Sequence, residues 1–166
     1  VSAMAPGVLG ITGVETAEMV RGVVERVQPQ AVIAVDALAA METKRICTTI
    51  QVTDTGIQPG SGVGNHRTGL TRETLGVPVI AVGIPMVVYA STIVRDALKD
   101  ILAQGSTEEA AEAMAERLSK GALREMVVTP RSIDELVAHL ADTLALAINI
   151  ALHPSFTARE LSFRLH

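Results

Sequence analysis

Two stretches of the chain are apolar at nearly every position, and both have the length of a strand. Residues 31–35 lead into Asp36, and residues 77–82 lead into Gly83. Strands that are apolar throughout are typical of sheets covered by helices. Residues 47–52 alternate between polar and apolar side chains and predict a third, half-polar strand.

Helical periodicity surrounds these strands. Thr12 and Glu15 have the spacing of a capping box, which predicts a helix from Thr12 to about Val27 that Pro29 ends. Three more helices are expected, at residues 87–102, 107–119 and 130–153. The last is mostly apolar and is expected to be buried across the sheet. The pattern predicts one α/β domain over residues 1–166, a layered sheet with helices on both faces.

Composition narrows the class of protein. The chain has 166 residues, 48% of them hydrophobic, and a net charge of −4. An acidic chain with three aromatic residues is not typical of proteins that bind nucleic acids or anionic membranes. No uninterrupted apolar run approaches the roughly 18 residues of a membrane span, and no signal peptide is visible, so we expect a soluble protein. The single cysteine, Cys47, forms no internal disulfide, which suits a reducing cytosol.

Asp36 is the first candidate for chemistry. An apolar strand that ends in a carboxylate delivers it to the carboxyl edge of a parallel sheet, where open α/β folds bind ligands. Burial there would raise its pKa toward neutrality, as a general acid or base requires. The alternative is that Asp36 caps a short helix over residues 37–42.

Residues 54–65 form a loop with four glycines and one proline. Asp54 opens this loop, and it would face the same crevice as Asp36 if the two strands were neighbours. An Asx-turn is the alternative role for Asp54. The backbone N–H groups of the loop could form an anion-binding nest, and the predicted cleft-lining residues are Asp54, Gly60, Ser61, Gly62, Asn65, His66 and Arg67.

Several cations follow or precede this loop and would suit an acidic peptide if they rim the cleft: Lys44, Arg45, His66, Arg67 and Arg72. Ordinary solvated surface charge is the alternative for each.

Signatures of other chemistries are weak, because Ser61 is not in a nucleophile elbow and the loop is not a P-loop. A metal held by Asp36, Asp54 and His66 is conceivable, but no cofactor is expected.

Six segments form a specific series: PGVLGITGVET (6–16), IAVDALAA (33–40), TIQVTDTGI (49–57), PGSGVGN (59–65), TLGVPVIAVGIP (74–85) and MVVTP (126–130). Taken in this order they resemble the germination protease family, the spore endopeptidases of endospore-forming bacteria.

The resemblance implies a phosphorylase/hydrolase-like fold shared with hydrogenase maturation proteases. It implies hydrolysis of small acid-soluble spore proteins during germination, next to acidic residues, by a cytoplasmic enzyme of the forespore or spore core. The family's enzyme is a self-processed zymogen and a homotetramer. One of the two aspartates in its proposed aspartic mechanism falls on Asp36, and the other would precede Val1, so the chain is expected to be an N-terminally truncated part of a longer protein.

Three hypotheses follow. The first is an endopeptidase in which Asp36 activates the attacking water. The second is a truncated relative that binds peptides in a regulatory role without cutting them. The third is a metal-dependent protease of the maturation type.

Overall fold

The computed structural model describes residues 1–7, 9–60, 68–102, 108–118, 123, 125–156 and 160. The chain divides into two compact units, Val1–Val128 and Thr129–His166. The single domain expected from the sequence stays a prediction.

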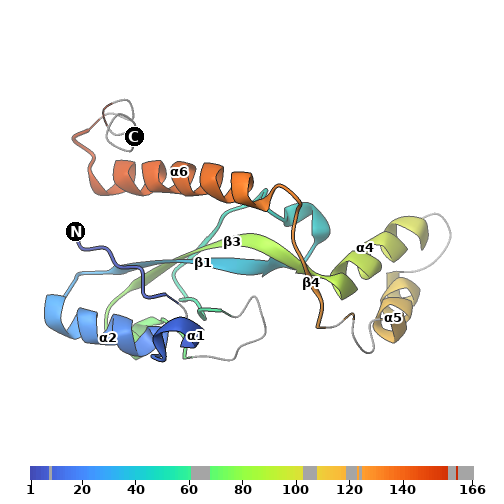
Figure 1. The fold of residues 1–166 in the computed structure, drawn as a ribbon, viewed down its shortest axis with the longest axis horizontal. Helices are drawn as coiled ribbons and strands as arrows, with labels where there is room; N and C mark the ends of the chain where they lie inside the picture. The colour runs from blue at the N-terminus through green and yellow to red at the C-terminus, as the bar shows by residue number, and fades with distance from the viewer. Residues whose placement is uncertain are drawn as a thin grey trace. The chain divides into compact units, whose positions relative to one another are not determined.

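The first unit is built around strand β3 (Val79–Tyr89), shown in green in Figure 1. Strand β1 (Val32–Ala40) pairs with it in parallel, while β2 (Gln51–Thr53) and β4 (Val127–Val128) pair with it antiparallel. The sheet order is β1-β3-β2. Both apolar stretches are therefore strands, and the predicted α/β class is confirmed.

The two long strands extend well beyond their predicted ends. β1 continues past Asp36 to Ala40, so the short helix considered after Asp36 does not form. Residues 37–40 instead pair with residues 84–88 of β3, with a shift of register after Leu38. This pairing overrides the helix preference of the alanines. Pro85, opposite Leu38, lies at the irregularity, where a strand tolerates proline.

Two helices precede β1. Helix α1 spans Leu9–Thr12, and α2 spans Thr16–Val27. The predicted capping box is wrong, because Thr12 ends α1 and its hydroxyl oxygen accepts from the N–H of Val14. The end of α2 is as predicted: Gln28, with a left-handed φ of 47°, stands directly before Pro29.

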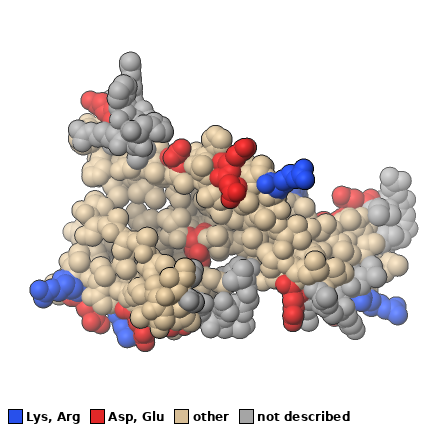
Figure 2. Space-filling view, viewed as in Figure 1, with Lys and Arg blue, Asp and Glu red and all other residues tan. Residues whose placement is uncertain are grey.

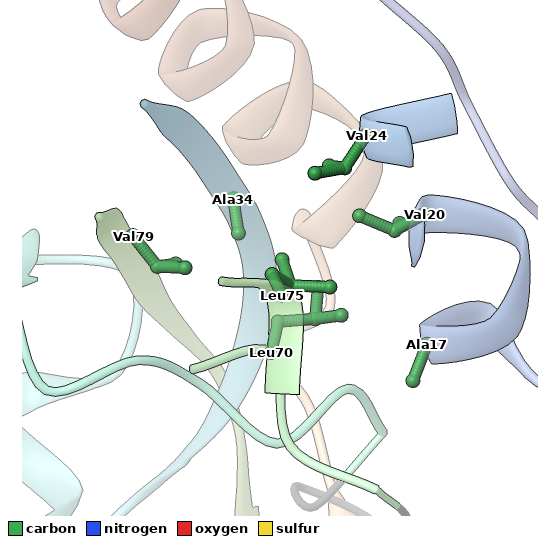
Figure 3. Close-up of a cluster of buried hydrophobic side chains, with 7 residues drawn as sticks. All are labelled: Ala17, Val20, Val24, Ala34, Leu70, Leu75 and Val79. Carbon is green, nitrogen blue, oxygen red and sulfur yellow. The ribbon is translucent and has the colours of Figure 1, made fainter. Parts of the chain in front are cut away.

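One face of the sheet carries the hydrophobic core (Figure 3). The side chains of α2 pack there against those of β1, β3 and the segment containing the short helix α3 (Arg72–Leu75). The buried members are Ala17, Val20, Val24, Ala34, Leu70, Leu75 and Val79. Since alternate residues of a strand share a face, Asp36 projects from the same face as Ala34.

The opposite face of the sheet is also apolar. Val35 and Val52 are 50% and 67% exposed there, and Ile33 and Ile80 are exposed to a smaller extent. Helices were expected on both faces of the sheet, and α2 and α3 cover one of them.

A second group of helices follows β3. Helix α4 (Ala90–Leu102) begins directly after the strand and packs against α5 (Glu108–Leu118). The short 3-10 helix η1 (Thr43–Arg45) lies against α4. Asp96 makes this junction, because its Oδ2 accepts from the N–H and the hydroxyl of Thr43 at 2.7 and 2.8 Å.

The second unit contains helix α6 (Ile133–Leu152). None of its residues is buried within this unit, and the expected burial across the sheet stays a prediction. By length and composition α6 could also cross a membrane, although a core helix of a soluble protein passes the same test. The sequence has no uninterrupted apolar run of that length, but a membrane-spanning helix tolerates a few charged residues.

Candidate functional site

Asp36 lies in the middle of β1 and not at its end. It is half-buried, and its partner across the ladder is Gly83 of β3. The carboxylate therefore stands on the face of the sheet, beyond the edge of the hydrophobic core, and not at the carboxyl edge that the sequence suggested.

Two backbone amides hold this carboxylate. The N–H of Ala37 donates to Oδ1 of Asp36 at 2.9 Å, and the N–H of Gly60 donates to Oδ2 at 2.9 Å. Asp36 thus fastens the glycine-rich loop to β1, which places the two features side by side as the sequence predicts. Each oxygen can accept a further hydrogen bond, for example from water.

Asp54 does not join Asp36. It follows β2, is exposed, and β3 lies between its strand and β1. Two strand spacings separate β1 and β2, roughly 10 Å. Asp36 and Asp54 were expected to share a crevice only if their strands were neighbours. Because β1 and β2 both pair with β3, they are not neighbours.

The described part of the loop is shaped by Gly56 and Gly60, which have φ of 92° and 75°. A Cβ on Gly56 would lie 2.4 Å from the carbonyl oxygen of Leu70. Next to it, Ile57 and Leu70 exchange two backbone hydrogen bonds of 3.0 and 2.7 Å. The other predicted cleft residues lie outside the described residues: Ser61, Gly62, Asn65, His66 and Arg67.

A pocket of about 260 Å³ opens beside Asp36, on the same face of the sheet. Its lining comes from all three strands of the sheet order and from the loop: Leu38, Gln51, Thr53, Gly56, Ile57, Gln58, Ala81 and Gly83. Sequence reasoning missed this pocket. The available signal was Gly83, because a glycine inside an apolar strand marks a close approach of another group.

Of the cations that were expected to rim the cleft, three are described, and none of the three lines the pocket. Lys44 and Arg45 contact Glu42 at 2.7 and 3.2 Å, and Arg72 is exposed on α3. The hydrogen bond from Lys44 and the charge of Arg45 lower the pKa of Glu42. Figure 2 shows acidic and basic side chains intermixed over α2, where Arg21 and Glu25 lie 4.0 Å apart.

Among the described residues no three His, Cys, Asp or Glu side chains are gathered as metal ligands. Of the set considered from the sequence, Asp36 and Asp54 are separated by β3, and His66 lies outside the described residues.

Comparison with known proteins decides the family. The germination protease family model matches residues 1–123. The chain belongs to the germination protease family. The germination protease of Caldanaerobacter subterraneus subsp. tengcongensis is 46% identical over the whole chain, which covers 56% of that relative. Those of Clostridium perfringens and Bacillus subtilis are 39% and 40% identical, over 98% and 92% of this chain and 55% and 54% of their own length.

The chain therefore spans about half the length of these germination proteases. Asp36 and Gly60 both lie within the part that the family model matches. Their catalytic and binding roles stay predictions.

Proposed function

We propose that this chain is part of a spore endopeptidase that degrades small acid-soluble spore proteins during germination, next to acidic residues. Membership of the germination protease family supports the reaction. The observation that carries the proposal is the hydrogen bond between the N–H of Gly60 and Asp36, because it fixes a carboxylate beside a pocket.

Asp36 is the general base in this proposal. Its carboxylate accepts a proton from the water that attacks the peptide carbonyl, and the amides of Ala37 and Gly60 hold it in position. An aspartic mechanism divides acid and base roles between two carboxylates. We place the second carboxylate in a part of the full-length protein that is not in this chain.

The wider properties of the enzyme are proposals of the same kind. They include a fold like that of hydrogenase maturation proteases, synthesis as a zymogen, a homotetramer, and a cytoplasmic location in the forespore or spore core. The proposed partners are the spore proteins, and neither nucleic acid, membrane nor cofactor takes part. The alternative to the aspartic mechanism is cleavage that depends on a divalent metal. Loss of cleavage after a chelator is added, and recovery when the metal is restored, would favour it.

The test is the Asp36→Asn variant of the full-length protein. Asn keeps the size of the side chain and one acceptor oxygen, so it can keep one of the two amide hydrogen bonds, but it cannot take a proton from water. We therefore expect kcat for peptide cleavage to fall about 10²–10⁴-fold. Peptide binding, measured by fluorescence anisotropy, should stay within threefold.

Two results would count against this role. A kcat close to that of the parent protein would remove Asp36 from the chemistry. A loss of binding as large as the loss of kcat would show that Asp36 only anchors the loop.

A further inference from the structure

We draw no further inference here: the strongest candidate, the exposed apolar face of the sheet formed by Ile33, Val35, Val52 and Ile80, carries no proposal, because nothing in the described part of the chain shows what covers it.

Discussion

Gly83 is a single residue on which both the sheet and the pocket depend. A Cβ at this position would lie 2.2 Å from Cδ1 of Leu38 and 2.8 Å from its Cγ. Both atoms belong to a side chain that can rotate, so the fold can adjust by moving Leu38. The absence of a methyl group at residue 83 therefore leaves the space that the side chain of Leu38 fills in the pocket wall.

Gly83→Ala should lower the free energy of unfolding by about 1–3 kcal/mol, as overpacking usually does. Combined with Leu38→Ala, it should cost at least 0.5 kcal/mol less than it does alone, because the clashing atoms are gone. Denaturant unfolding of the single and double variants measures this coupling. Additive effects would mean that the two residues do not meet.

Asp96 predicts how stability depends on pH. Burial acts to raise the pKa of Asp96, but the hydrogen bonds from Thr43 and the contact with Arg95 outweigh it and lower the pKa below 3.8. Because the folded state binds the proton less readily than the unfolded state, this group stabilises the fold above about pH 4. The contribution is lost as the pH falls through the lowered pKa.

Asp96→Asn should therefore cost about 1.5–3 kcal/mol at pH 7, the range for hydrogen bonds to a charged group. The gap between variant and parent should narrow as the pH falls below about 4. Urea unfolding at several pH values checks this, and a gap that stays constant down to pH 3 would contradict it.

Among the helices, α2 offers a test of stability that leaves the site untouched. Gly22 lies inside α2, and a Cβ there would meet no atom within 4 Å. Gly22→Ala should raise the free energy of unfolding by about 0.5–1 kcal/mol, because alanine loses less backbone entropy in a helix.

The matched comparison is Gly56→Ala, which places a Cβ against the carbonyl of Leu70 at a φ of 92° and should destabilise the protein. Thermal unfolding should shift in opposite directions for the two variants. Shifts of the same sign would contradict the backbone conformations described for Gly22 and Gly56.

The existence of most elements could be predicted from local pattern, whereas the ends of the two long strands could not. Residues 37–40 have the composition of a helix, and they form strand because β3 offers them partners far along the chain. Thr71 and Thr74 exchange capping bonds at α3, without the glutamate that usually marks such a box. Pairing and capping of this kind depend on contacts that no local window contains.

At the scale of the whole molecule, the candidate site could be predicted in part. Asp36 and the glycine-rich loop are marked by residue type, and the structure joins them through Gly60. The separation of Asp36 from Asp54 depends on strand order, and the pocket depends on residues from three strands and a loop. The residues of such a site come together only when segments that are distant in the sequence pair.

The relatives are about twice as long as this chain, and the sheet presents exposed apolar side chains such as Val35 and Val52 on one face. Catalysis should therefore be measured in the full-length protein, in which any further contacts of this face are present.

The most direct measurement is kcat for peptide cleavage by Asp36→Asn, compared with Asp100→Asn, which removes an exposed carboxylate from α4. If Asp36 is the base, its variant loses at least about 100-fold in kcat while Asp100→Asn stays near the parent value. Equal rates for the two variants would contradict the account.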